Sequence, residues 1–268
     1  MSGPASRWDD LRPRLISAAV MISVGALELW LGGPSFTLLV IILTALMLWE
    51  LGRMTSLSAQ SRSPLILAGV GAASLALCIW SGEQAGAALL LVPALCFALT
   101  RRRDRRLSAA WAAAAMISGY GLIYLRNEAG TPAILWLVLV VIASDVMGYF
   151  AGRILGGPKF WPAISPKKTW SGTVAGWVGA ALVGLGFVMA GYAGWGLVAL
   201  SPLVAFGGQM GDIAESWVKR RAGVKDSSAL IPGHGGVLDR FDAMTGAVVL
   251  LILLSLLANL PLPVASGG

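Results

Sequence analysis

The sequence predicts an all-helical protein that crosses a membrane about nine times. Of its 268 residues, 57% are hydrophobic and only 12% are charged, about half the charged fraction of soluble domains. The hydrophobic residues gather into runs, and roughly 17–25 apolar residues suffice for one transmembrane helix. The predicted spans are residues 15–31, 36–52, 64–81, 85–100, 109–125, 132–151, 172–192, 194–216 and 241–260.

The distribution of charge predicts the orientation of these spans. Of the 20 cations, 19 fall in the N-terminal tail or in loops predicted to lie on the same side of the membrane as that tail. Arg126 is the exception and falls on the other side. The positive-inside rule therefore places the N-terminus in the cytoplasm and the C-terminus outside, and we expect a plasma (inner) membrane protein whose site faces the cytoplasm. Binding to nucleic acid is not expected from the net charge of +7, because no soluble domain carries it.

The first half of the chain is predicted to be a scaffold. Residues 1–130 form five runs with short joints and are the expected place of dimer contacts, whereas residues 131–268 form the expected catalytic region with cytoplasmic loops 152–171 and 217–240. Glu50 stands out in the first half, because a carboxylate in an apolar run is costly and often functional. It also lies close enough to a predicted helix end to reach headgroups, so its role stays open.

Several acids lie in or beside the spans of the second half. Asp212, Glu215 and Lys219 share one face of a predicted helix, and Asp239 and Asp242 open the last helix. Glu215 and Lys219 also have the spacing of an i,i+4 ion pair. Acids at a helix start also suit the helix dipole. Carboxylates brought together repel unless a cation neutralises them, and Mg²⁺ is commonly held by one or two carboxylates and substrate phosphates. We therefore expect Mg²⁺ at Asp212 and Asp239, with Asp242 and Asp145 as further candidate ligands.

Two loops carry candidate phosphate contacts. Lys167 and Lys168 precede hydroxyl side chains and a predicted helix start, an arrangement that suits an anion, although positive-inside charge explains the lysines equally. Pro166 predicts an ordered turn there rather than a helix. In the second loop, glycines flank His234, and their N–H groups suit a phosphate. A lone histidine argues against a zinc hydrolase site, and its role stays open between loop packing and ligand contact.

The stretch from Ser216 to Asp242 resembles the signature of the phosphatidate cytidylyltransferases, the CDP-diacylglycerol synthases. The matching positions are Ser216-x-Val218-Lys219-Arg220, Lys225-Asp226-x-Ser228 and Ile231-Pro232-x-His234-Gly235-Gly236-Val237-x-Asp239-Arg240-Phe241-Asp242. The segments SPKKTW at 165–170 and DVMGYFAGR at 145–153 resemble the same family. The resemblance implies transfer of CMP from CTP to phosphatidic acid, dependence on Mg²⁺ and a second cation, and a homodimer among membrane lipids.

The residue patterns and the family resemblance indicate the same candidate site. The residues expected to act in catalysis are Asp212, Asp239, Asp242, Lys167, Lys168, Lys219 and Arg220. The residues expected to bind phosphate or substrate are Ser165, Lys167, Lys168, Thr169, Ser216, Lys219, Arg220, Lys225, His234, Gly235, Gly236 and Arg240. Two alternatives stay open: a related CTP-dependent transferase acting on another lipid, and, in a different class, a secondary transporter of a phosphorylated substrate.

Overall fold

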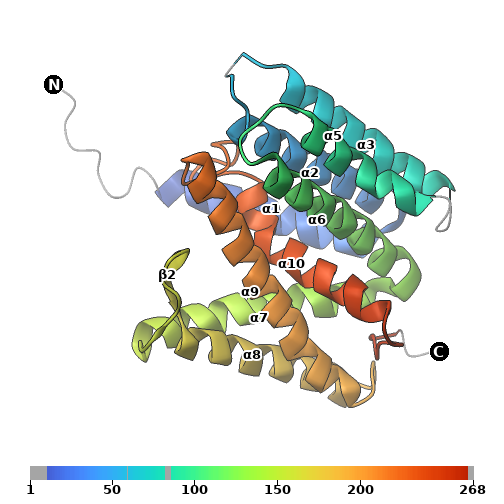
Figure 1. Ribbon diagram of the computed structural model, residues 1–268. Helices are drawn as coiled ribbons and strands as arrows, with labels where there is room; N and C mark the ends of the chain where they lie inside the picture. Colours follow the sequence, from blue (N-terminus) through green and yellow to red (C-terminus); the bar gives the residue numbers. More distant parts are fainter. Residues whose placement is uncertain (1–10, 59, 82–85, 265–268) are drawn as a thin grey trace.

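The computed structural model describes residues 11–58, 60–81 and 86–264 and confirms the all-helical class (Figure 1). The chain is a polytopic membrane protein built of packed helices. The helices are α1 (Leu11–Leu31), α2 (Gly33–Met54), α3 (Ser63–Ser81), the short η1 (Ala87–Leu91), α5 (Val92–Leu99), α6 (Arg105–Tyr124), the π-turn η2 (Leu125–Ala129), α7 (Gly130–Ile154), α8 (Trp170–Met189), α9 (Gly196–Ala222) and α10 (Leu238–Ser255).

Each predicted span overlaps one of these helices. Among the described residues, 6 stretches are long and apolar enough to cross a membrane, and one of them, Arg105–Ile154, contains both α6 and α7. The η1–α5 segment is shorter, and α10 is not among the six. The polytopic architecture is thus confirmed, whereas the count of nine crossings stays a prediction.

The 158–170 segment contains a small hairpin where the sequence predicted only a turn. Strand β1 (Lys159–Trp161) pairs antiparallel with β2 (Ser165–Thr169), with Lys159 opposite Thr169 and Trp161 opposite Ser165. Pro166 is tolerated because both strands of a two-stranded ribbon are edges, where a missing N–H need not break a ladder. The hairpin runs directly into α8, whose first turn is capped by the Thr169 hydroxyl, which accepts a hydrogen bond from the Gly172 N–H (3.2 Å).

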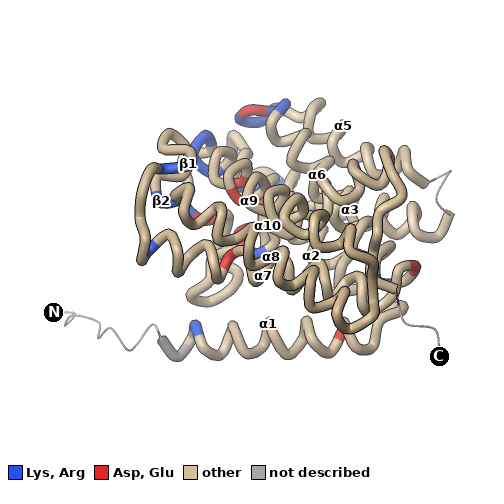
Figure 2. Tube along the Cα trace, turned by 90° about the horizontal axis from the view of Figure 1, so that it is seen from below, with Lys and Arg blue, Asp and Glu red and all other residues tan. Residues whose placement is uncertain are grey.

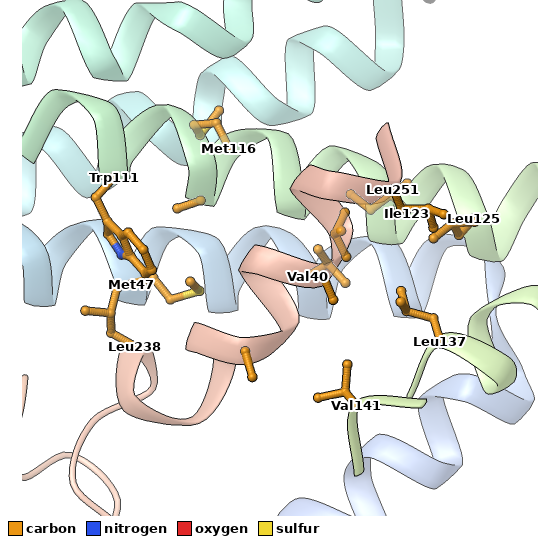
Figure 3. Packing of buried hydrophobic residues seen from close by; sticks show 14 of the residues in the cluster. Val40, Met47, Trp111, Met116, Ile123, Leu125, Leu137, Val141, Leu238 and Leu251 are labelled. Atoms are coloured by element: carbon orange, nitrogen blue, oxygen red, sulfur yellow. The ribbon is translucent and has the colours of Figure 1, made fainter. Parts of the chain in front are cut away.

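Buried apolar side chains fill the space where α2, α6, α7 and α10 meet (Figure 3). Leu238 at the start of α10 lies beside Met47 and Trp111, which ties the first turn of α10 to α2 and α6. One polar pair lies within this core: the Trp136 indole donates to the Ser201 hydroxyl over 2.9 Å. Such pairing is favoured because lipid offers no hydrogen-bond partner to a buried polar group. The buried Trp111 indole N–H and the Thr245 hydroxyl have no such partner among the described residues.

Glycines allow the helices of the second half to approach closely. A methyl group on Gly246 of α10 would lie 2.6 Å from the Gly211 Cα of α9. The same holds for α8, since a methyl group on Gly176 would lie 2.7 Å from the Ser144 hydroxyl. Small residues at helix interfaces are a general device for packing within membranes. Here they bring α7, α8, α9 and α10 together around one cavity.

Helix α1 differs from the others, because it runs along the outside of the bundle (Figure 2). None of its membrane-spanning window is buried. Its far end is held by Arg126, whose guanidinium donates to the carbonyl oxygens of Leu29 (3.0 Å) and Trp30 (3.3 Å). Of the predicted cytoplasmic cations, Arg7 lies outside the described residues.

Candidate active site

The four acids predicted as metal ligands line a single cavity of about 540 Å³. Asp145 comes from α7, Asp212 from α9, and Asp239 and Asp242 from the first turns of α10. The cations that line the same cavity are Arg153, Lys167 and Lys168. The structure thus brings these acids, from three helices, to the same cavity as the SPKKTW segment at 165–170.

Lys168 and Asp212 form the central ion pair of this cavity. The Lys168 ammonium lies 2.6 Å from an Asp212 carboxylate oxygen and also donates to the Gln209 carbonyl oxygen over 3.2 Å. The Ser216 hydroxyl contacts the other Asp212 oxygen at 3.4 Å. The side chains of Lys168 and Asp212 are 24% and 36% exposed, so both remain accessible from the cavity. A cation for phosphate and a carboxylate for metal thus lie side by side.

Lys219, a predicted phosphate contact, is not among the residues that line the cavity. Its ammonium bridges Glu215 (2.5 Å) and Asp239 (2.7 Å), and the Glu215 side chain is fully buried. The i,i+4 pair with Glu215 that the sequence suggested is therefore present, and it extends to α10. A buried carboxylate is stable only with a partner, so Lys219 acts as the counter-ion that lets Glu215 and Asp239 lie close together. Its contact with phosphate stays a prediction.

Asp239 also organises the loop that precedes α10. One of its oxygens accepts hydrogen bonds from the Ser227 N–H (2.9 Å), the Ser227 hydroxyl (2.9 Å) and the Gly236 N–H (2.7 Å). Its other oxygen accepts from Lys219 (2.7 Å). Asp239 thereby holds the loop against the end of α9, while its side chain still borders the cavity.

Glu50 of α2 is the member of the site whose role the sequence left open. Its carboxylate is fully buried and lies within hydrogen-bond distance of four donors, one of which, the Ser227 hydroxyl, it shares with Asp239. The donors are the Ser227 hydroxyl (3.1 Å), the Ser228 hydroxyl (2.6 Å) and the N–H groups of Val237 (3.0 Å) and Leu238 (2.7 Å). Its signal in the sequence was the isolated carboxylate in an apolar run. No spacing rule could have shown that its partners lie about 180 residues later in the chain.

The Gly-His-Gly-Gly segment forms a tight turn at the outer edge of the loop. The Ile231 N–H donates to the Gly235 carbonyl oxygen (2.8 Å), and Gly233 and Gly235 have φ values of +74° and +80°. Only glycine adopts such angles without strain. The His234 ring nitrogen Nδ1 lies 2.7 Å from the Ser17 hydroxyl of α1. His234 therefore packs as a hydrogen-bonded loop residue, and its contact with a ligand stays a prediction.

Other predicted binding residues lie around the loop rather than in the cavity wall. Arg220, Lys225 and Arg240 are exposed, and Arg240 donates to the His234 carbonyl oxygen over 2.8 Å. Arg153, which was not among the predicted site residues, lines the cavity and donates to the Tyr149 hydroxyl over 2.6 Å. Its spacing of four residues from Tyr149 on α7 was the signal that could have placed it there.

The donor set suits a hard divalent cation, although the carboxylates are not gathered as a ready metal cage. Among the described residues, no three His, Cys, Asp or Glu side chains converge as a metal site. Mg²⁺ does not require such a cage, because it keeps waters and takes one or two protein carboxylates with substrate phosphates. Asp212 of α9 and Asp239 and Asp242 of α10, which border the cavity on adjacent helices, fit that requirement.

Comparison with known proteins identifies the family of this chain. A family model described as "Cytidylyltransferase family" matches residues 12–257. The chain is 36% identical over 261 residues to a phosphatidate cytidylyltransferase of Brucella abortus, covering 91% of this chain and 93% of the relative. It is also 45% identical over 138 residues to the enzyme of that name from Helicobacter pylori, covering 50% of this chain and 52% of the relative. The chain therefore belongs to the cytidylyltransferase family.

Proposed function

We propose that the protein is a phosphatidate cytidylyltransferase, which converts CTP and phosphatidic acid into CDP-diacylglycerol and pyrophosphate. The observation that carries the proposal is the cavity in which Asp145, Asp212 and Asp242 face Lys167 and Lys168 at one end of an apolar bundle. The relatives named for this reaction align over nearly the whole chain. A membrane-embedded cavity that combines acids and cations suits a reaction between two phosphates, one of them carried by a lipid.

The reaction needs positioning and charge neutralisation rather than a protein nucleophile. An oxygen of the phosphatidate phosphate forms a bond to the α-phosphorus of CTP, while the bond from that phosphorus to the pyrophosphate oxygen breaks. Lys167, Lys168 and Arg153 offer positive charge to the phosphates from two sides of the cavity. Preorganised charges of this kind stabilise the charge that develops in the transition state.

We further propose that Mg²⁺ binds at Asp212 and Asp239, with Asp242 and Asp145 beside them. When bound, Mg²⁺ would neutralise phosphate charge and polarise the reacting centre. Lys168 then contributes in two ways: it shields Asp212 while the cavity is empty of substrate, and its ammonium reaches a phosphate placed next to that carboxylate. Asp239 holds the preceding loop against the first turn of α10 by accepting hydrogen bonds from Ser227 and Gly236.

The proposal includes a location. The cations of the hairpin and of the loops gather at one end of the bundle (Figure 2), and the positive-inside rule makes that end cytoplasmic, where CTP is present. We propose the plasma (inner) membrane as the site of action and a homodimer as the working state, the latter from the family resemblance alone.

The direct test is an assay of the purified protein with radiolabelled CTP, phosphatidic acid and Mg²⁺, scored for a labelled liponucleotide. Parallel reactions offer a polyprenyl phosphate and an ether-linked phosphatidate, which separates the proposed substrate from related lipids. We expect product with phosphatidate and none in the presence of excess EDTA. Absence of a liponucleotide with every lipid acceptor would contradict the assignment, and transport of unmodified substrate into vesicles would favour a transporter.

Variants test the roles of the acids. We expect Asp212→Asn and Asp239→Ala to lower kcat by about 100-fold or more, the usual scale for the loss of one charge-stabilising group. Because Asp239 also holds the loop, Asp212→Asn is the cleaner test of a ligand at α9. The control is Glu128→Gln, which changes an exposed acid of η2 that does not border this cavity. Near-normal rates in Asp212→Asn would refute the metal assignment.

A further inference from the structure

We propose that the apolar cavity beneath α1 holds one acyl chain of the phosphorylated lipid substrate. The inference rests on the proposed function and adds to it the place where the lipid tail binds. Three features support it: the chemistry of the cavity wall, its junction with the polar cavity, and the loose packing of α1.

The cavity has a volume of about 350 Å³ and lies between α1, α2, α6, α7 and α10. That volume falls in the range of roughly 300–1,000 Å³ typical of pockets for small ligands. Its wall is almost entirely hydrocarbon, with Met21 and Leu29 on one side and Val138 and Phe241 on the other. Among its lining residues only Thr44 and Ser118 carry a polar side-chain group, and none is charged. Such a wall accepts an alkyl chain and rejects a nucleotide.

The apolar cavity adjoins the polar one along two helices. On α10, Phe241 and Met244 line the apolar cavity, while the neighbouring Asp242 lines the polar cavity. On α7, Ile142 lines the apolar cavity and Asp145, three residues further on, lines the polar cavity. One helical turn covers about 5.4 Å, so residues that line the two cavities lie within about one turn of each other on both helices. A ligand with a phosphate at one end and an alkyl chain at the other can occupy both.

Helix α1 forms an outer wall that permits access from the bilayer. It lies along the edge of the bundle (Figure 2), and none of its membrane-spanning window is buried. Near its start, the Ser17 hydroxyl contacts the His234 ring (2.7 Å) and donates to the Pro232 carbonyl oxygen (3.0 Å). The helix is thus tied to the loop that carries the site, while its middle is not packed into the core. A lipid can slide under such a helix without unfolding the bundle.

Gly25 provides a precise probe of this space. It lines the apolar cavity, and a methyl group added there would meet no atom within 4 Å. Gly25→Leu therefore adds hydrocarbon to the cavity without a backbone clash. Gly69 of α3 is the matched control, because a methyl group added there would also meet no atom within 4 Å, and Gly69 does not line the cavity. Ala26→Leu, at a second lining position of α1, guards against a fault specific to one variant.

The experiment measures KM for dioleoyl and dihexanoyl phosphatidate in mixed micelles with the purified full-length protein. We expect the ratio of the long-chain KM to the short-chain KM to rise about tenfold in Gly25→Leu and Ala26→Leu, equivalent to losing roughly two buried methylenes. Gly69→Leu should keep the wild-type ratio.

Each other outcome has a defined meaning. A wild-type ratio in both α1 variants would overturn the inference and assign the cavity to bulk lipid or to a contact with a second copy of the chain. An equal rise in both KM values would also overturn it, because the variants would then act on the headgroup site. If the wild-type protein forms no liponucleotide from either lipid, the proposed function itself fails, which is a separate result.

Discussion

Replacing Glu50 by glutamine should loosen the loop that connects α9 to α10. The Glu50 carboxylate accepts hydrogen bonds at both oxygens: one takes the Ser228 hydroxyl and the Val237 N–H, and the other takes the Ser227 hydroxyl and the Leu238 N–H. Glutamine retains a single acceptor oxygen, and its NH₂ group would face the remaining donors. The serine hydroxyls can rotate, but whichever way the amide points, one backbone N–H loses its acceptor.

The size of the effect follows from that geometry. Val237 and Leu238 are buried to 4% and 0% exposure, so water does not readily replace the lost acceptor. An unsatisfied buried N–H costs about 1–3 kcal/mol. The lost negative charge at the start of α10 adds about 0.3–1 kcal/mol. The expected loss in the free energy of unfolding is therefore about 1.5–4 kcal/mol.

The assay is thermal unfolding of purified protein in detergent, together with a Mg²⁺ titration of activity. We expect the Tm of Glu50→Gln to fall by about 3–16 °C. We also expect half-maximal activity to require more Mg²⁺, because the loop that Glu50 supports also contacts Asp239 through Ser227 and Gly236. A merely structural defect would lower Tm and leave the Mg²⁺ requirement at the wild-type value.

Glu28→Gln is the matched control for this prediction. Glu28 is also an acid in a predicted span, but one of its oxygens is buried without a hydrogen-bond partner among the described residues. Its amide should leave Tm equal to the wild-type value or higher. If Glu50→Gln matched Glu28→Gln in both Tm and Mg²⁺ requirement, the hydrogen bonds described at Glu50 could not support the loop.

Two further predictions concern packing and charge. Gly211→Ala places a methyl group against the Asp242 carbonyl oxygen and within 2.8 Å of the Gly246 Cα. We therefore expect overpacking to lower the free energy of unfolding by about 1–3 kcal/mol and to lower kcat. An unchanged kcat would show that the acids tolerate separation of α9 and α10. The hydrogen bond from Arg221 lowers the pKa of Asp104 below its ordinary 3.8. The Arg221–Asp104 ion pair therefore stabilises the folded protein above that pH, and this stabilisation is lost as the pH falls through the lowered pKa. The Tm of Asp104→Asn should therefore lie below wild type at pH 7 and converge with it in strong acid, and a constant difference would exclude the ion pair as the cause.

The sequence predicted those parts of the protein that depend on local pattern. Runs of apolar residues predicted the helices, and acids such as Asp212 and Asp239 were identified because charge beside lipid is costly. The meeting of these acids with Lys168 in one cavity was also expected. The helix-period argument further placed Lys219 next to Glu215, as the structure confirms.

Features that depend on packing between distant segments could not be predicted in the same way. Lys219 turns inward to Asp239 because Gly211 and Gly246 let α9 and α10 approach, and the spacing of charges on one helix does not show this. The short hairpin at 159–169 was missed because a strand of three residues carries almost no periodic signal. The partners of Glu50 could not be predicted because they lie far from it along the chain.

Arg126 differs from the other cations of this protein in its position. It is the exception to an otherwise one-sided distribution of cations, yet its guanidinium is engaged by the last carbonyl oxygens of α1. Cations favour the C-terminal end of a helix because the carbonyl groups there carry partial negative charge. Arg126 is thus a helix cap supplied from another segment, and its position reflects the end of α1 rather than the side of the membrane. Arg126→Lys would retain the charge and lose the planar fork that reaches two carbonyl groups at once.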